Sequence, residues 1–329
     1  MAISVREQYV TTPDGWSLHL RRTISPLHFD PATKPLLIVP GYGMNTFIFS
    51  YHPRDTSMER CLAEGGYEVW SVNLRDQGPS RPSMSHPGEV SLLKYARVDV
   101  PAAIRHVLSS TKTNADRVSL IGASLGGTIA YAYLALHASL DPAQHLVDEL
   151  ITMGAPLRWD EVHPVLRVAF FWPKLVGAVR MSGTRAMVRR AMPLLVRAPQ
   201  LLSIYMNTHN IDMSRMPQMT NTVEDPNPDI NRDIAHWIKS RDLLLGGINV
   251  TDAMKQQRLP LLVVLSNKDG IVPEATALTA RDAWGGSDVE VLRVGDEDNW
   301  YAHANLFIAD DAPTRVFDPI IAWLRRIAA

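Results

Sequence analysis

The alternation of short apolar runs with helix-like segments is the feature that most restricts the fold of this chain. The first set has apolar runs at 36–39, 67–72, 117–121 and 150–153, with helical patterns at 57–64, 92–109 and 125–136. The second set has runs at 261–265 and 289–294 and helical patterns at 274–284 and 315–327. Strands that alternate with helices form parallel sheets covered on both faces, so the sequence predicts an α/β protein.

A hairpin is expected before this series. Residues 7–11 and 17–22 alternate in polarity, and Pro13-Asp14-Gly15 between them is typical of a turn. With the hairpin included, we expect a mainly parallel sheet of about eight strands. The chain has 329 residues, which suits two domains or one large domain with an insertion.

The alternating order breaks between about Leu157 and Gln256. This stretch has no convincing strand, and its apolar residues recur at helical spacing. It also holds 8 of the 13 methionines of the chain. We therefore predict an α/β core formed by 1–156 and 257–329, with a helical cap at 157–256 inserted after the sixth strand.

Composition excludes several other classes of protein. The formal net charge of −1 provides no basic field for nucleic acid, and no apolar run reaches the roughly 18 residues of a membrane span. Cys61 is the single cysteine, so no internal disulfide and no multi-cysteine metal site can form; we expect it to pack inside a helix. The N-terminus lacks a signal-peptide pattern, which favours a cytoplasmic protein. The sequence does not indicate an oligomeric state.

A G-x-S-x-G motif lies between a predicted strand and a predicted helix. Gly122-Ala123-Ser124-Leu125-Gly126 follows the run at 117–121 and opens the helical pattern at 125–136. On such a tight turn the serine hydroxyl projects above the sheet edge, and glycines leave room for the crowded backbone. The alternatives are a plain glycine-rich βα turn and a phosphate-binding turn. For the second, neither G-x-x-x-x-G-K-[ST] nor G-x-G-x-x-G is present. We predict Ser124 as a nucleophile.

A serine hydroxyl needs a base to accept its proton, and an acid to orient that base. Asp269 follows the apolar run 261–265, and His303 follows the last predicted strand. The order serine, acid, histidine matches that of hydrolases with this strand-to-serine turn. We expect His303 within about 2.6–3.2 Å of both Ser124 Oγ and the Asp269 carboxylate. Asp160 is the reserve candidate for the acid.

Two backbone N–H groups must stabilise the oxyanion that forms when the serine attacks. One should belong to Leu125, the residue after the nucleophile. The other should lie in the glycine-rich loop after the first parallel strand, Pro40-Gly41-Tyr42-Gly43-Met44. We expect Tyr42 to supply it, with Met44 as the alternative because the two glycines allow more than one loop path.

These motifs together resemble the α/β-hydrolase superfamily, particularly its lipase and esterase branch. The resemblance covers residues 30–156 and 257–329 and rests on Pro40 to Gly43, Ser71 to Gly78, Gly122 to Gly127, Asp269 and His303. It implies a serine hydrolase with a helical lid and without metal or cofactor. Pro40 stands where many members have histidine. The Pro-Gly-Tyr-Gly start and long cap also resemble polyhydroxyalkanoate enzymes, whose synthases use cysteine; Ser124 favours hydrolysis.

The predicted cap bears on the substrate. Its methionines and aromatics indicate either the core of the cap itself or an adaptable apolar acyl pocket. Its first half is rich in arginine, which indicates a solvated helix face, or a site for an anionic lipid surface or an acyl-CoA thioester. We expect hydrolysis of small or lipid-like esters with an apolar acyl part. An acyltransferase, a thioesterase, a polyester hydrolase and a non-enzymatic binding protein remain alternatives.

Overall fold

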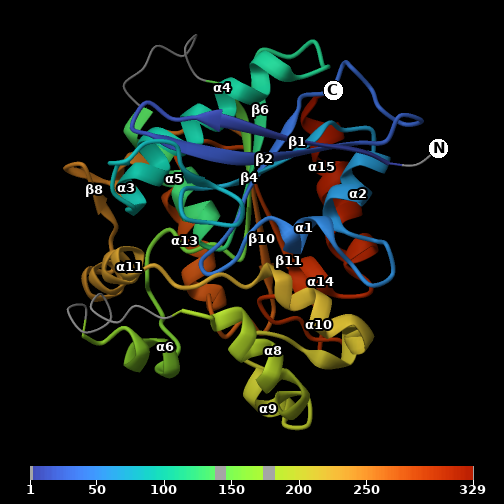
Figure 1. Cartoon of the computed structure of the whole chain (residues 1–329), viewed down its shortest axis with the longest axis vertical. Helices are drawn as coiled ribbons and strands as arrows, with labels where there is room; N and C mark the ends of the chain where they lie inside the picture. Colours follow the sequence, from blue (N-terminus) through green and yellow to red (C-terminus); the bar gives the residue numbers. More distant parts are fainter. Residues whose placement is uncertain (1–2, 138–145, 173–181, 329) are drawn as a thin grey trace.

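A mixed β-sheet forms the centre of the molecule (Figure 1). The computed structural model describes residues 3–137, 146–172 and 182–328. The sheet order is β1-β2-β4-β3-β6-β7-β10-β11, and the short β5 pairs with β2. The strands are β1 (Ser4–Thr11), β2 (Trp16–Ile24), β3 (Leu36–Val39), β4 (Val69–Asn73), β5 (Arg81–Pro82), β6 (Val118–Ala123), β7 (Val147–Met153), β10 (Leu261–Ser266) and β11 (Val289–Val294).

The predicted α/β class and mainly parallel sheet are confirmed. From β4 through β3, β6, β7 and β10 to β11 all neighbours are parallel. Only the N-terminal side is antiparallel, where β2 pairs with β1 and with β4. The predicted hairpin forms β1 and β2, and Gly15 in its turn has φ +87°, a conformation that glycine adopts at low cost.

Side chains of the central strands pack on both faces of the sheet, as expected of strands in a parallel sheet. In β3, Leu37 and Val39 belong to the apolar cluster of one face, whereas Leu36 and Ile38 belong to the other. The first face is covered by α4 (Val100–Ser110), α5 (Leu125–His137) and α13 (Glu274–Ala283); the second by α2 (Met58–Glu64) and α15 (Asp318–Ala328). Figure 1 shows the two groups on opposite sides.

Two of the predicted helices contain a π-helical turn that the spacing of apolar residues did not indicate. The pattern at 92–109 starts as the short α3 (Leu92–Lys94), continues as a π-helical turn at Tyr95–Asp99 and only then becomes α4. The π-helical turn ends on Asp99, whose buried carboxylate lies 2.7 Å from Arg75 Nη2. A similar turn at Pro313–Phe317 precedes α15. A π-helical turn is a local departure from α-helical hydrogen bonding, and the spacing of apolar residues does not report it.

The segment between β7 and β10 is mainly helical. It contains α6 (Pro164–Ala169), α8 (Thr184–Leu195), α9 (Pro199–Leu202), α10 (Met216–Met219), α11 (Pro228–Ser240) and α12 (Val250–Met254). Figure 1 shows α6, α8, α9 and α10 below the sheet. The short helices α1 (Phe47–Ser50) and α14 (Asn305–Ile308) follow β3 and β11.

The expectation that this segment has no strand is corrected. β8 (Leu244–Leu245) and β9 (Ile248–Asn249) form a small hairpin around Gly246 and Gly247, whose φ values are +57° and +83°. A Gly-Gly pair is a recognised two-residue hairpin turn, and the strands are too short to show alternation. α12 packs against α5 and α13. The limits of the cap at 157 and 256 stay a prediction.

Candidate active site

Ser124 lies on a sharp turn between β6 and α5. Its φ is +53°, a left-handed conformation that non-glycine residues rarely adopt. The turn is held by hydrogen bonds from Ser124 N to Met153 O (2.8 Å) and from Gly127 N to Ser124 O (2.9 Å). Strained backbone of this kind is found at active sites, where the surrounding structure enforces it. The sequence motif therefore adopts the geometry that it predicted.

The flanking glycines allow three backbone segments to approach one another. A Cβ at Gly126 would lie 2.2 Å from Val39 O, and one at Gly122 would lie 2.4 Å from Gly127 Cα. Any larger side chain would push α5 away from β6 or from the loop after β3. The motif thus brings the start of α5 and the carboxyl ends of β3 and β6 to one point, with Ser124 at its centre.

Asp269 and His303 meet beside this turn. His303 Nδ1 lies 2.7 Å from Asp269 Oδ2, and both side chains are almost fully buried. The other carboxylate oxygen, Oδ1, accepts hydrogen bonds from the N–H groups of Ile271 and Val272, each at 2.8 Å. The carboxylate is therefore fixed, and it selects the tautomer that keeps Nε2 of His303 free to accept a proton.

The reserve acid lies elsewhere. Asp160 is exposed and pairs with Arg158 at 3.0 Å. Because Asp269 already occupies Nδ1 of His303, Asp160 is not needed to orient the imidazole.

Ser124 and His303 line one cavity of about 220 Å³. Its walls are otherwise almost entirely apolar and come from both the sheet edge and the segment after β7: Tyr42, Met44, Leu125, Pro156, Trp159, Leu166, Phe170, Tyr205, Ile234, Trp237, Ile238, Ile271 and Val272. Across residues 3–137, 146–172 and 182–328, the Ser124 hydroxyl makes no hydrogen bond. The contact between Ser124 and His303 stays a prediction; such bonds are often loose before substrate binds.

The loop predicted to hold the oxyanion passes directly over Ser124. A Cβ on Gly41 would lie 2.8 Å from Ser124 Cβ, so the backbone of Gly41 lies directly against Ser124. In the described part of the chain, the N–H groups of Tyr42, Met44 and Leu125 donate no hydrogen bond. All three N–H groups therefore lack a protein acceptor there, and the choice of Tyr42 over Met44 stays a prediction.

Residues of the segment after β7 hold this loop in place. Asn45 N donates to Thr222 O (3.0 Å), and Glu224 N donates to Gly43 O (2.9 Å). Met44 and Val223 form an isolated antiparallel bridge between the two segments. The predicted oxyanion loop is therefore one side of a short two-stranded contact.

A second contact holds the loops of Asp269 and His303. Asn305, which is fully buried, accepts from Asn207 N (2.7 Å) and donates to Asn207 O (3.0 Å). Beside it, Ala304 N donates to Tyr205 O (2.8 Å), and Gly270 N donates to Ile204 O (3.1 Å). Residues 204–207 thus hold the loops of Asp269 and His303 in place by hydrogen bonds.

Sequence reasoning missed Tyr205 and Asn305. The Tyr205 ring centre lies 6.1 Å from that of His303, and burial raises the pKa of Tyr205 to about 12, so its hydroxyl stays protonated near neutral pH. Only its tertiary position marks Tyr205. A signal for Asn305 was present, because an asparagine within the apolar run Ala304 to Phe307 needs buried hydrogen-bond partners.

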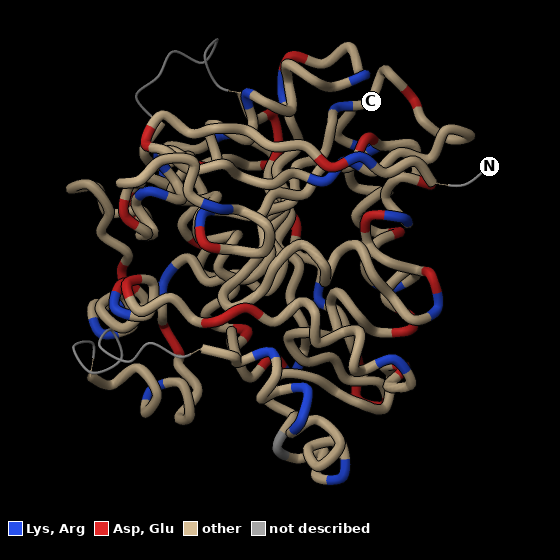
Figure 2. Tube along the Cα trace, in the orientation of Figure 1, with Lys and Arg blue, Asp and Glu red and all other residues tan. Residues whose placement is uncertain are grey.

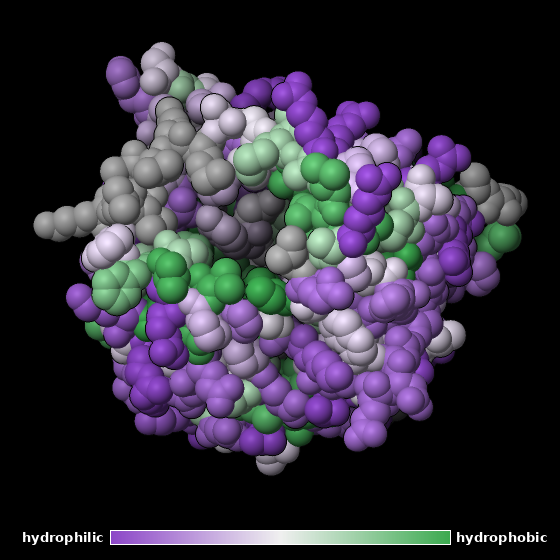
Figure 3. Space-filling model, turned by 90° about the horizontal axis from the view of Figure 1, so that it is seen from below, coloured by the Kyte–Doolittle hydropathy of each residue, from purple (hydrophilic) through white to green (hydrophobic). Residues whose placement is uncertain are grey.

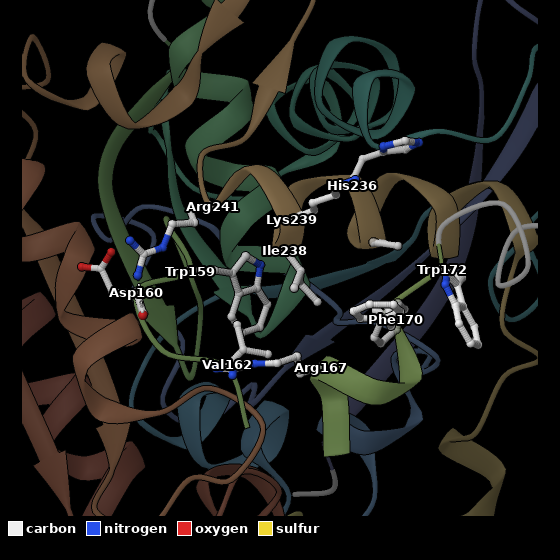
Figure 4. Close-up of a pocket in the computed structure, with 12 residues that line it drawn as sticks. Trp159, Asp160, Val162, Arg167, Phe170, Trp172, His236, Ile238, Lys239 and Arg241 are labelled. Atoms are coloured by element: carbon white, nitrogen blue, oxygen red, sulfur yellow. Dashed lines mark hydrogen bonds between the residues drawn. The ribbon is translucent and has the colours of Figure 1, made fainter. Parts of the chain in front are cut away.

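The cavity lined by Ser124 and His303 is called the inner pocket below. Two larger cavities share lining residues with it. The methionine cavity, about 410 Å³, shares Tyr42 and Tyr205 with it and is lined by Met192, Met206, Met216 and Met219. The outer cleft, about 750 Å³, shares Trp159, Phe170 and Ile238 with the inner pocket. Figure 4 shows the outer cleft, in which Trp159 and Ile238 stand between Arg241 on one side and Phe170 and Trp172 on the other. Each of the two larger cavities therefore shares part of its wall with the pocket of Ser124.

Among the described residues, no group of three or more His, Cys, Asp or Glu side chains could hold a metal ion. No helix within the described ranges is long and apolar enough to cross a membrane.

Comparison with known proteins agrees with this geometry. Residues 34–300 match the family model described as alpha/beta hydrolase fold. A Burkholderia cenocepacia protein provisionally named an aryl esterase has a TM-score of 0.63 and 19% identity, with 98% of this chain and 99% of that chain covered. A thermophilic esterase from Thermogutta terrifontis has a TM-score of 0.62 and 18% identity, with 98% of this chain and 100% of that chain covered.

A further structure with this fold is a 2-hydroxy-6-oxo-6-phenylhexa-2,4-dienoate hydrolase from Rhodococcus. Its TM-score is 0.62 at 16% identity, with 99% of this chain and 100% of that chain covered. No curated protein sequence matches the chain. At these identities the structural matches establish the fold, and the substrate has to be inferred from the site.

Proposed function

The chain belongs to the α/β-hydrolase family, and from this premise we propose that it is a serine hydrolase that cleaves carboxylic esters with an apolar acyl part. The observation that carries the proposal is the left-handed Ser124 in the lining of an apolar pocket that is also lined by His303, itself bonded to Asp269. The similar structures from Burkholderia cenocepacia and Thermogutta terrifontis are both named as esterases, which supports the same class of reaction.

In the proposed mechanism, Ser124 Oγ attacks the ester carbonyl carbon while Nε2 of His303 accepts the hydroxyl proton. The N–H groups of Leu125 and Tyr42 stabilise the oxyanion, and Asp269 stabilises the imidazolium. The imidazolium then gives its proton to the departing alcohol, which leaves an acyl group on Ser124. Water attacks this acyl-enzyme with His303 again as the base, and the carboxylic acid is released.

The apolar lining of the inner pocket supports the proposed substrate class. A charged acyl part would lose its hydration there without gaining a partner, whereas an alkyl or aryl part would be stabilised by burial. We also propose that 157–256 acts as the cap that closes the pocket, since Trp159, Phe170, Tyr205 and Trp237 supply much of its wall.

The test is a series of p-nitrophenyl esters of rising acyl length, given to the wild type and to Ser124→Ala. We expect hydrolysis by the wild type, and a loss of kcat by a factor of about 10⁴ or more in the variant. A phosphonate ester should add one covalent adduct to the wild type and none to Ser124→Ala. A variant that keeps most of its activity and still takes up the label would refute the assignment.

Product analysis separates hydrolysis from acyl transfer. The proposal requires free carboxylic acid as the main product when an added alcohol or thiol competes with water. Predominant transfer to the added nucleophile would instead assign an acyltransferase to the same site.

A further inference from the structure

The charges of the chain are unevenly distributed. Between Glu161 and Glu224 the sequence has eight lysines and arginines and one acidic residue, Asp212, although the whole chain carries a formal net charge of −1. α6 and α8 contain no acidic residue at all. In Figure 2 the tube of α8 is marked with basic residues and not with acidic ones. This part of the molecule is therefore a basic region on a nearly neutral protein.

Large apolar side chains are exposed in the same region. The most exposed of them are Val168 (78%), Leu194 (68%), Phe171 (63%) and Trp172 (63%), and Val165, Met187 and Val196 are exposed as well. Exposed apolar side chains that gather in one area indicate an interaction site, whereas isolated ones need no explanation. Here the exposed apolar side chains lie on α6, on α8 and on the residues next to them, the same segments that carry the arginines.

The two faces of α8 explain why these side chains are not needed for folding. Val188, Met192 and Leu195 point inward and line the methionine cavity. The opposite face presents Met187 and Leu194, together with Arg189 and Arg190, to solvent. The helix is thus apolar on its inner face and both apolar and cationic on its outer face, a composition suited to the surface of a bilayer.

Most of the described arginines on and near α6 and α8 are available for an external partner. Arg185 pairs with Glu224 at 2.9 Å. By contrast, within residues 3–137, 146–172 and 182–328, Arg167, Arg189, Arg190 and Arg197 take part in no salt bridge.

The surface also borders a cleft that lies beside the pocket of Ser124. Arg167, Phe171 and Trp172 line the outer cleft, which adjoins the inner pocket at Trp159, Phe170 and Ile238. Figure 3, which views the molecule from below, shows apolar side chains on both sides of a hollow, with strongly hydrophilic ones beside them. A bilayer lying on this face would meet this hollow.

We propose that this outer surface, defined by Arg167, Phe171, Trp172, Met187, Arg189, Arg190, Leu194 and Arg197, docks the protein on an anionic lipid bilayer. The aromatic and aliphatic side chains enter the headgroup region, and the guanidinium groups bind lipid phosphates. A nucleic acid would use the arginines but would leave the exposed apolar side chains in water. The inference goes beyond the proposed function and does not depend on it.

The test is cosedimentation with vesicles of phosphatidylglycerol or of phosphatidylcholine, with Ser124→Ala protein so that binding is measured without catalysis. We expect binding to phosphatidylglycerol that weakens as salt is raised, and little binding to phosphatidylcholine. The double reversal Arg189→Glu with Arg190→Glu should lower the vesicle partition coefficient at least about tenfold. Trp172→Ala with Phe171→Ala should lower it severalfold, because apolar burial is lost.

Matched controls lie far from this surface. Arg105→Glu with Lys112→Glu makes the same change in net charge at the α4 end of the molecule, and Leu27→Ala removes an equally exposed apolar side chain. Both should bind like the parent protein. In protein that keeps Ser124, the double variant Arg189→Glu with Arg190→Glu should hydrolyse a soluble short ester at the parent rate. The proposal would be overturned if control and test variants lost vesicle binding equally, or if the parent protein did not bind phosphatidylglycerol vesicles at low salt. Binding to duplex DNA but not to vesicles would overturn it as well.

Discussion

His303 Nδ1 and Asp269 Oδ2 lie 2.7 Å apart, although the residues are separated by 34 positions and follow different strands. Both side chains are shielded from water, which strengthens the interaction between a carboxylate and a developing imidazolium. The relationship therefore supports the proposed role of Asp269 more directly than sequence order does.

We predict that Asp269→Asn lowers kcat by a factor of about 10⁴, because an amide stabilises neither the required tautomer nor the imidazolium. Steady-state hydrolysis of a p-nitrophenyl ester measures the effect. Asp160→Asn, which removes the reserve acid, should change kcat little. A large loss in Asp160→Asn with a small loss in Asp269→Asn would reverse the assignment.

Gly126→Ala should destabilise the protein by about 3 kcal/mol or more, because the new methyl group would overlap Val39 O. Gly183→Ala is the matched control: its Cβ meets no atom within 4 Å, and only the strain of φ +77° remains. Thermal unfolding of both variants distinguishes crowding from backbone strain. Equal melting temperatures for the two variants would contradict the crowded geometry around Ser124.

Asn305→Ala should lower both stability and turnover. The substitution removes the partners of Asn207 N and Ala302 N, and unsatisfied buried groups cost about 1–3 kcal/mol each. The loop of His303 would lose its hydrogen bonds to Asn207, and His303 would be positioned less well. We therefore expect kcat to fall by a larger factor than KM rises. Asn114→Ala, at an exposed site, is the control for a simple loss of an amide side chain. Unchanged kcat in a folded Asn305→Ala protein would exclude a positioning role.

Tyr205→Ala should shift the preferred substrate toward longer acyl chains. The ring of Tyr205 lines both the inner pocket and the methionine cavity, so its removal would join the two spaces. Tyr205→Phe keeps the ring and should keep the wild-type preference. The measurement is kcat/KM across an ester series of rising length. The same profile for Tyr205→Ala and Tyr205→Phe would show that the methionine cavity does not receive the acyl part.

Arg75→Met should cost about 3–5 kcal/mol of folding free energy, because it leaves the Asp99 carboxylate buried without its cation. Arg60→Met removes a solvent-accessible arginine that pairs with Glu64 at 3.0 Å, and should cost about 1 kcal/mol or less. Urea unfolding of both variants provides the comparison. Similar losses would mean that the Arg75 pair contributes no more than a surface pair.

Much of the architecture could be predicted because it depends on local patterns. Apolar runs bounded by turns identified the strands, and the glycines around Ser124 have the spacing that close backbone approach demands. The π-helical turns at Tyr95–Asp99 and Pro313–Phe317 could not be predicted, because the spacing of apolar residues does not distinguish such a turn from an α-helix. The two-residue β8 and β9 were too short for periodicity to register.

The sequence by itself determined the order of the main strands and helices, the turn of Ser124 and the three residues proposed for catalysis, because these depend on local residue patterns and on their order along the chain. Only the tertiary structure decided what surrounds them. Residues 204–207 fasten the loops of Asp269 and His303, 222–224 pair with the loop of Tyr42, and Tyr205 separates two cavities. These contacts join segments far apart in the chain, and packing rather than local pattern selects them.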